Sequence, residues 1–146
     1  MFNHILFVCI GNICRSPSAE YWAKQQLNQE GIRIESAGLQ AVVGAGIAPQ
    51  AEIILEKYGV DCSQHRARQL ELEHIAAAGI IFVMEAWQED DVLQRFPMAR
   101  GKLFTLGKWI DEEIEDPYRK SQAVFDKTFE LVKQGWSSWQ ERLWPS

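Results

Sequence analysis

The sequence predicts an α/β fold in which four parallel strands form a sheet with helices on both faces. Strand-like apolar runs alternate with helix-like segments along the 146 residues. This alternation is typical of a parallel sheet with right-handed crossovers. The run from Ile80 to Met84 is apolar at every position, as expected for a strand covered on both faces. No linker or internal repeat interrupts the pattern, so we expect a single domain over residues 1–146.

Apolar runs place the four strands at residues 4–8, 33–36, 80–84 and 102–106. Helical patterns lie between them, at residues 17–30, 49–58, 70–78 and 86–96. Gly31 and Gly59 are expected to end the first two helices, because glycine adopts the left-handed conformation that closes a helix. In the second helix, Ile53, Ile54 and Tyr58 are expected on one side.

A last helix of about six turns is predicted near the end of the chain. Its apolar residues recur at spacings of three and four, which places them on one broad stripe. The stripe consists of Phe125, Phe129, Val132, Trp136, Trp139 and Leu143. We therefore expect this helix to pack against the sheet.

Composition excludes several classes of protein. The net charge of −5 argues against general binding to nucleic acid or to membrane surfaces. No apolar run approaches the ~20 residues that cross a bilayer, and the N-terminus lacks a signal-peptide pattern. A cytoplasmic protein without membrane insertion is therefore expected. The three cysteines do not suggest a disulfide framework, and Cys62 with His65 supplies too few ligands for a metal site.

The segment Cys9-Ile10-Gly11-Asn12-Ile13-Cys14-Arg15-Ser16-Pro17 lies where the first strand meets the first helix. Ligands of parallel sheets bind beyond the carboxyl ends of the strands, and a helix N-terminus attracts anions. Arg15 offers a planar fork that matches two phosphate oxygens. It and the helix terminus would also favour the thiolate form of Cys9. The segment therefore predicts phosphate-ester binding and transfer of the phosphoryl group to sulfur.

Other residues of this segment suit an anion-binding loop. Gly11 permits close approach to the backbone, and Asn12 tolerates the left-handed conformation of an N–H nest. Ser16 suits the helix N-cap and Pro17 the first helical position. The plain alternative for Cys9 is a buried cysteine at the end of a strand. The combined pattern favours the anion loop.

A second catalytic group is expected in the loop of residues 107–118. A cysteine that displaces a phenol benefits from an acid that protonates the leaving oxygen, and the same group can then activate water. Asp116-Pro117-Tyr118 is the candidate. Pro117 biases Asp116 toward an extended backbone, and Tyr118 is placed to wall the cleft against an aromatic guest. By itself this tripeptide in an acidic loop is usually only a turn.

The anion loop and Asp116-Pro117-Tyr118, in this order and at this separation, resemble the motifs of the low-molecular-weight protein tyrosine phosphatases. The resemblance continues through Ser36-Ala37-Gly38, His65-Arg66-Ala67-Arg68-Gln69 and Val83-Met84-Glu85, and so covers nearly the whole chain. It implies a four-stranded parallel sheet flanked by helices, with no metal or cofactor.

The resemblance also implies roles for single residues. Cys9 would be the nucleophile, Arg15 would bind the phosphoryl group, and Asp116 would act first as general acid and then as base. Ser16 would donate a hydrogen bond to the Cys9 sulfur. A supporting network is implied for Asn12, Ser36 and His65. Substrate contacts are implied for Ile10, Gly11, Asn12, Ile13, Cys14, Ser16, Leu39 and Tyr118.

Cys14 matches the second cysteine of the family, which can form a reversible disulfide with Cys9 under peroxide. The plain alternative is a small buried side chain, and both interpretations stay open. Arg119 follows Tyr118 where animal members carry a second aromatic residue. This pattern is similar to the bacterial branch that dephosphorylates membrane tyrosine autokinases of capsule and exopolysaccharide export. The implied partner is the phosphotyrosine-rich cytoplasmic tail of such a kinase, and a monomer is expected.

Three alternatives use the same anion loop. An arsenate reductase on this scaffold needs a cysteine pair in the middle of the chain, where Cys62 stands alone. A phosphocarrier must resist hydrolysis and has no use for Asp116. A non-catalytic phosphotyrosine-binding module would be expected to lose Cys9 or Asp116. Ester hydrolysis fits the residues best.

Overall fold

The computed structural model describes residues 2–145 and contains a four-stranded parallel sheet with the strand order β2-β1-β3-β4. The strands are β1 (His4–Cys9), β2 (Arg33–Gly38), β3 (Ile80–Val83) and β4 (Leu103–Thr105). The helices are α1 (Arg15–Leu27), α2 (Pro49–Lys57), α3 (Leu72–Ala77), α4 (Ala86–Arg95) and α5 (Gln122–Leu143), with short 3-10 turns η1 (Pro97–Ala99) and η2 (Lys108–Ile110). The predicted fold class is confirmed.

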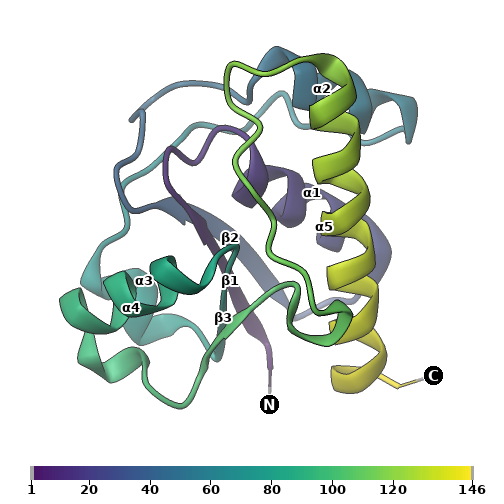
Figure 1. Cartoon of the computed structure of the whole chain (residues 1–146). Coiled ribbons are helices and arrows are strands. Elements are labelled where there is room, and N and C mark those ends of the chain that lie inside the picture. Colours follow the sequence, from purple (N-terminus) through teal and green to yellow (C-terminus); the bar gives the residue numbers. More distant parts are fainter. Residues whose placement is uncertain (1, 146) are drawn as a thin grey trace.

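Helices cover the sheet on both faces, and side chains along β1 alternate between the two faces. Phe7 belongs to a core with Phe82 and Trp136, beneath α1 and α5. The neighbouring Leu6 and Val8 belong to a second core, beneath α3 and α4. Figure 1 shows α5 crossing one face of the sheet while α3 and α4 lie on the other. Buried side chains therefore cover β1 on both faces up to its end at Cys9.

The last helix follows the prediction, and its stripe is buried where it meets the sheet. Phe125, Phe129, Val132, Trp136 and Trp139 are buried. The ring of Trp136 has no exposed surface and meets that of Phe7 edge to face, with centroids 5.8 Å apart. Such aromatic contacts add to the free energy of burial.

The beginning of α1 differs from the prediction. The helix starts at Arg15 rather than at Pro17, and the N-cap is Cys14, which makes no capping bond through its side chain. The expectation that Ser16 caps the helix is wrong, because its hydroxyl group lies 2.9 Å from the Cys9 sulfur. The helix ends at Leu27 with Asn28 as its left-handed C-cap, rather than at Gly31, which also has a positive φ of 82° but lies beyond the helix.

In α2, the expected apolar side is rotated. Ile53 and Tyr58 are 45% and 43% exposed, and only Ile54 of the three predicted residues is buried. Ala51 and Leu55 join it against α5. The inward stripe therefore starts two residues earlier than expected.

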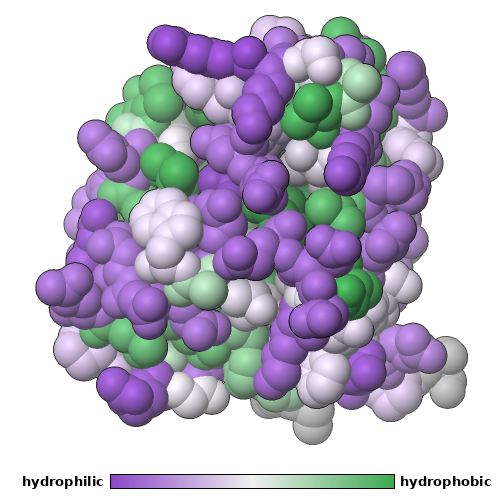
Figure 2. Space-filling view, in the orientation of Figure 1, coloured by the Kyte–Doolittle hydropathy of each residue, from purple (hydrophilic) through white to green (hydrophobic). Residues whose placement is uncertain are grey.

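The molecular surface is mainly polar. In Figure 2 hydrophilic residues cover most of the face in view, and hydrophobic residues appear as small separate groups. Within residues 2–145, no helix combines the length and the apolar character needed to span a membrane.

Candidate active site

The loop between β1 and α1 spans the carboxyl edge of the sheet. Asn12 has a φ of 59°, in the left-handed region that this residue type tolerates. The carbonyl groups of residues 9, 10, 11 and 13 accept hydrogen bonds from the segment of residues 39–48. Among the described residues, no backbone or side-chain acceptor takes a hydrogen bond from the N–H groups of residues 10–15. The loop thus keeps a set of donors for an anion.

Gly38 allows this loop to lie against the end of β2. A Cβ atom at this position would stand 2.5 Å from the carbonyl oxygen of Ile10, which is closer than side-chain carbon atoms approach. Only glycine fits there, and any larger residue would push the loop away from the sheet.

A cavity of about 170 Å³ opens above the loop. It is lined by Cys9, Ile10, Gly11, Ile13, Cys14, Arg15, Gln40, Val42, Asp116 and Tyr118. The fold therefore brings the nucleophile, the arginine and the acid expected from the sequence to one small space. They come from segments about a hundred residues apart in the chain.

Leu39 does not belong to this lining. Its N–H group bonds to the Cys9 carbonyl, as a continuation of β2, and its side chain points into the core on the α3 and α4 face. It is only 4% exposed, so its side chain does not line the cavity, and a substrate contact at this position stays a prediction. Gln40 and Val42 line the cavity instead. Asn12 and Ser16 are also fully buried, and their side chains support the loop from beneath.

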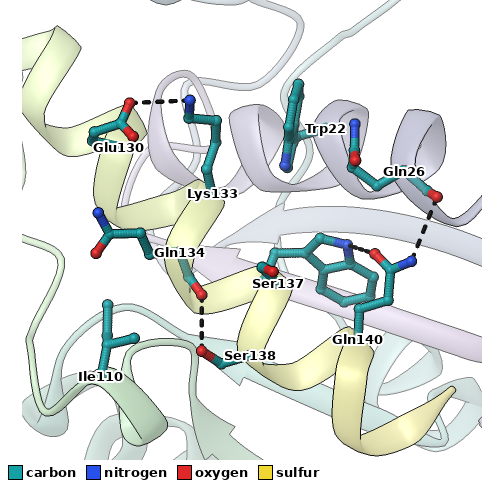
Figure 3. Close-up of a pocket in the computed structure, with 10 residues that line it drawn as sticks. Trp22, Gln26, Ile110, Glu130, Lys133, Gln134, Ser137, Ser138 and Gln140 are labelled. Atoms are coloured by element: carbon teal, nitrogen blue, oxygen red, sulfur yellow. Dashed lines mark hydrogen bonds and ion pairs between the residues drawn. The ribbon is translucent and has the colours of Figure 1, made fainter. Parts of the chain in front are cut away.

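Larger hollows exist but carry no comparable chemistry. The groove between α1 and α5 measures about 500 Å³. Figure 3 shows it lined by amide and hydroxyl side chains and by the ion pair of Glu130 with Lys133, 3.0 Å apart. No thiol lies among its lining residues. The smaller cavity at Cys9 combines a thiol with a buried arginine and a carboxylate.

Arg15 is held at one end and free at the other. Its side chain is 1% exposed, and Nη1 donates to Glu85 Oε2 at 3.1 Å and to the Ile114 carbonyl at 2.7 Å. Among the described residues, Nη2 has no hydrogen-bond partner. It lies 3.9 Å from Asp116 Oδ2. A buried guanidinium with an unpaired N–H group facing the cavity is suited to bind phosphate oxygens.

The Cys9 sulfur lies at the bottom of the cavity, beside a serine. Ser16 Oγ is 2.9 Å from Cys9 Sγ. Asn12 Nδ2 donates both to Ser16 Oγ at 2.8 Å and to Ser36 Oγ at 2.9 Å. His65 Nε2 lies 2.7 Å from the Asn12 carbonyl. The expected network residues therefore meet under the loop.

The surroundings of His65 favour its neutral form. Burial lowers its pKa below the ordinary value of 6.5, although the hydrogen bond to the Asn12 carbonyl acts in the opposite direction. The tautomer is set by the acceptor, because a carbonyl oxygen can only accept. Nε2 therefore carries the hydrogen and donates it to Asn12.

Cys14 lines the cavity but faces a core that includes Phe125 and Phe129. Burial, followed by the nearby Cys9 and Asp116, raises the pKa of its thiol from 9.0 to about 12. It is therefore a thiol rather than a thiolate at neutral pH. This favours Cys9 over Cys14 as the nucleophile.

Asp116 sits on a loop that is fixed at its base. Ile114 is fully buried, and its N–H group bonds to the Met84 carbonyl at 3.0 Å. Asp116 Oδ1 accepts a hydrogen bond from the Tyr118 N–H group at 3.0 Å, so Oδ2 is the atom turned to Arg15. The Tyr118 ring is half exposed, with the Arg119 guanidinium 5.3 Å from its centre.

Three supporting residues were not predicted to have a role. Glu85 anchors Arg15, Gln69 bonds to the backbone of residues 39 and 41 beside the cavity, and Glu20 accepts a hydrogen bond from Ser36. A sequence signal exists for Glu85, because it follows a buried strand at the edge where ligands bind. Glu20 lies on a helix without any such signal.

Known proteins share this sequence and this architecture. Residues 4–145 match the family model "Low molecular weight phosphotyrosine protein phosphatase". The phosphatase Ptp of Acinetobacter johnsonii is 41% identical over 97% of this chain and 99% of its own length. The phosphatase Wzb of Escherichia coli K12 is 38% identical over 98% of this chain and 97% of its own length.

Solved structures agree with these relatives. The tyrosine phosphatase AmsI of Erwinia amylovora has a TM-score of 0.92 and 38% identity, with 97% of this chain and 93% of that chain covered. The YwlE arginine phosphatase of Geobacillus stearothermophilus has a TM-score of 0.82 and 32% identity, with 96% and 95% covered. The chain belongs to the low molecular weight protein tyrosine phosphatase family, a family of hydrolases.

Proposed function

We propose that this phosphatase hydrolyses phosphotyrosine through a phosphocysteine intermediate. The observation that carries the proposal is the meeting of three groups at one cavity. Cys9 Sγ lies beside Ser16 Oγ, and the free Nη2 of Arg15 lies 3.9 Å from Asp116 Oδ2. These are the groups that nucleophilic attack, phosphoryl binding and protonation of a leaving group require.

In the first step the Cys9 thiolate attacks phosphorus, and the bond from phosphorus to the tyrosine oxygen breaks. The protonated Asp116 carboxyl gives its hydrogen to that oxygen, and tyrosine leaves as a neutral phenol. Arg15 and the loop N–H groups stabilise the charge on the phosphoryl oxygens. In the second step a water molecule attacks phosphorus and passes a proton to Asp116. The bond from sulfur to phosphorus breaks, which restores the Cys9 thiolate.

The walls of the cavity favour an aromatic ester. Ile13, Val42 and Tyr118 line it with apolar surface above the polar floor. A phenyl ring fits against such walls, whereas the guanidinium of phosphoarginine would lose its hydration there. This is the reason to prefer phosphotyrosine over the phosphoarginine on which a structural relative acts.

The physiological partner follows from the relatives. Those called Wzb, AmsI and EpsP carry the name low molecular weight protein-tyrosine-phosphatase, and the sequence resembles the bacterial branch that acts on tyrosine autokinases of capsule and exopolysaccharide export. We propose that this enzyme, as a monomer with one catalytic domain in the cytoplasm, removes phosphate from the tail of a membrane tyrosine autokinase in such a system. An arsenate reductase is not favoured, because Cys62 is buried in a core with no other cysteine of the middle region beside it.

Cys14 is proposed to protect Cys9 against oxidation by forming a reversible disulfide with it under peroxide. Treatment of Cys14→Ser with peroxide should then cause loss of activity that a thiol reductant does not restore. Full recovery of Cys14→Ser by the reductant would exclude this protective role.

The phosphatase proposal is tested by hydrolysis of an aryl phosphate by reduced protein in the presence of a chelator. We expect wild type and the control Cys62→Ser to be active and Cys9→Ser to be inactive, since Cys62 lies outside the cavity. Phosphotyrosine and phosphoarginine peptides are compared in the same assay. Inactivity of folded wild type, or a preference for phosphoarginine, would contradict the proposal.

A further inference from the structure

A buried chain of hydrogen bonds joins the nucleophile to a carboxylate on α1. It runs from Cys9 Sγ to Ser16 Oγ at 2.9 Å, to Asn12 Nδ2 at 2.8 Å, to Ser36 Oγ at 2.9 Å and to Glu20 Oε1 at 2.6 Å. Ser16, Asn12 and Ser36 have no exposed surface, and Glu20 is 3% exposed. Bulk water does not reach this chain, so its members determine the direction of each hydrogen bond.

The hydrogen bonds of Asn12, in the middle of the chain, have a fixed direction. Asn12 Oδ1 accepts a hydrogen bond from the backbone N–H group of Arg68 at 3.0 Å. A backbone N–H group can only donate, so the amide oxygen must face Arg68 and the amide nitrogen must face the two serines. Ser16 and Ser36 therefore both accept from Asn12.

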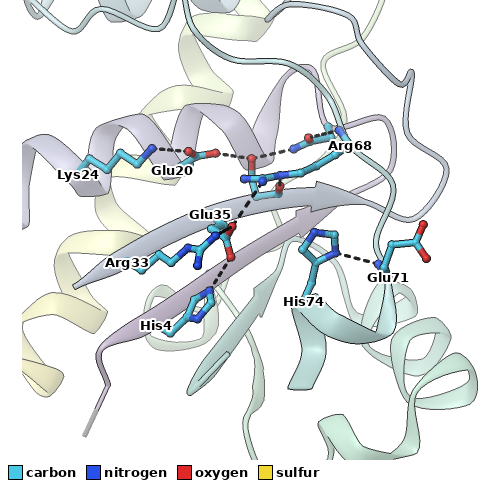
Figure 4. A network of polar contacts seen from close by, with 10 residues as sticks. His4, Glu20, Lys24, Arg33, Glu35, Arg68, Glu71 and His74 are labelled. Carbon is cyan, nitrogen blue, oxygen red and sulfur yellow. Dashed lines mark hydrogen bonds and ion pairs between the residues drawn. The ribbon is translucent and has the colours of Figure 1, made fainter. Parts of the chain in front are cut away.

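The end at Glu20 fixes the direction of the remaining hydrogens. A carboxylate has no hydrogen to give, so Ser36 donates to Glu20 while it accepts from Asn12. Lys24 holds the second carboxylate oxygen, Oε2, and Figure 4 shows Glu20 between Lys24 and the sheet. Ser16 already accepts from Asn12, so its own hydrogen is available for the Cys9 sulfur.

We propose that Glu20 is a positioning residue. By accepting the Ser36 hydrogen it leaves Ser36 free to accept from Asn12, and so it acts together with the Arg68 N–H group to hold Asn12 in the orientation in which the Ser16 hydroxyl donates to Cys9. This inference rests on the proposed function, because it concerns the preparation of Cys9 as nucleophile and as leaving group. The donor at Arg68 is part of the backbone and survives any substitution of that residue. The hydrogen bond from Ser36 to Glu20 is the one whose direction a substitution can reverse.

The variant Glu20→Gln should reverse the direction of the hydrogen bond between Ser36 and residue 20. The ammonium group of Lys24 attracts the carbonyl oxygen of the new amide, and the amide nitrogen then faces Ser36. Ser36 is left with donors on both sides and no acceptor for its hydrogen, which disturbs the orientation of Asn12. In Glu20→Gln/Lys24→Met the attraction is absent, so the amide can rotate and offer its oxygen to Ser36.

The readout is alkylation of Cys9 by iodoacetamide as a function of pH, located by peptide mass spectrometry, together with kcat for an aryl phosphate. A hydrogen bond to the thiolate favours ionisation, so its loss should raise the pH midpoint by about one unit and lower kcat about tenfold. We expect Glu20→Gln/Lys24→Met to bring the pH midpoint and kcat most of the way back to the wild-type values. Glu56→Gln, the same change at an exposed helix position, is the matched control.

Ser36→Ala removes the hydroxyl that joins Asn12 to Glu20, so it should also raise the pH midpoint of Cys9 alkylation. This second variant provides the test if Glu20→Gln does not fold. An unchanged midpoint in folded Glu20→Gln and in Ser36→Ala would overturn the proposal. Equal impairment of Glu20→Gln and the double variant would overturn it too. Alkylation needs no turnover, so failure of the proposed function would appear separately, as absent hydrolysis by wild type.

Discussion

Replacing Glu85 with glutamine measures how much the anchored end of Arg15 contributes to phosphoryl binding. Arg15 Nη1 donates to Glu85 Oε2 at 3.1 Å, and the two side chains are 1% and 18% exposed. A hydrogen bond that involves a charged group contributes about 1.5–3 kcal/mol, and we place the bond from the guanidinium to a neutral amide oxygen at the low end of this range. The change keeps the shape and removes the charge, so it should cost on the order of 1–1.5 kcal/mol.

This cost predicts a fall in kcat/KM of about five- to tenfold, at about 1.4 kcal/mol for each factor of ten. The effect stays this small because the Ile114 carbonyl still accepts from Arg15 Nη1 at 2.7 Å. The inhibition constant of inorganic phosphate should rise together with KM, since both report the position of the same guanidinium.

The assay is steady-state hydrolysis of p-nitrophenyl phosphate, with phosphate inhibition and the melting temperature measured on the same samples. Glu112→Gln is the control. It removes the same charge from an exposed residue of the acidic loop. A lower melting temperature for Glu85→Gln with unchanged kcat/KM would refute the reasoning. Equal losses in both variants would also refute it, because the effect would then come from the loss of negative charge near the cavity and not from the hydrogen bond to Arg15.

Three other predictions concern the proton donor Asp116, the hydrophobic core and the stability of the fold at low pH. Asp116→Asn should slow poor leaving groups by roughly 10²–10⁴-fold and good ones far less; equal losses across a series of aryl phosphates would remove Asp116 from the acid role. Trp136→Ala should lower the free energy of unfolding by about 3–5 kcal/mol, measured by urea denaturation, because the ring is fully buried beneath the sheet. Burial alone would raise the pKa of Glu35, but the hydrogen bond from His4 and the charges of two arginines outweigh it and hold this pKa below 4.5. A lowered carboxyl pKa stabilises the fold above the unfolded value and less as pH falls through the folded one. Glu35→Gln should therefore make stability fall less steeply as pH drops below about 4.5. If the melting temperature of the variant falls with pH as steeply as that of wild type, the role given to the Glu35 contacts is contradicted.

The sheet and most of the residues that meet at the cavity could be predicted because their signals are local. Each strand is an apolar run, and Cys9 and Arg15 share one loop. The errors arose where a side chain serves a distant partner. Ser16 looks like a helix cap from its neighbours, yet its hydroxyl lies at the Cys9 sulfur, so the helix begins at Arg15.

The partners of the supporting residues could not be predicted for a related reason. Glu85 and Arg15 are separated by 70 positions, and only the pairing of β1 with β3 brings their segments to the same edge. Leu39 faces the core because the alternation of β2 continues past the predicted end of the strand at residue 36, through Gly38 to Leu39. Contacts between elements, unlike the elements themselves, depend on the register of the sheet.

The most direct test of the mechanism is to look for the phosphoryl group on the protein. Wild type is mixed rapidly with an aryl phosphate and quenched, and its peptides are mapped by mass spectrometry while release of the phenol is followed. The mechanism predicts an initial burst of phenol and a phosphoryl group on Cys9. Turnover without a burst, with no phosphoryl group on Cys9 at any time, would contradict it.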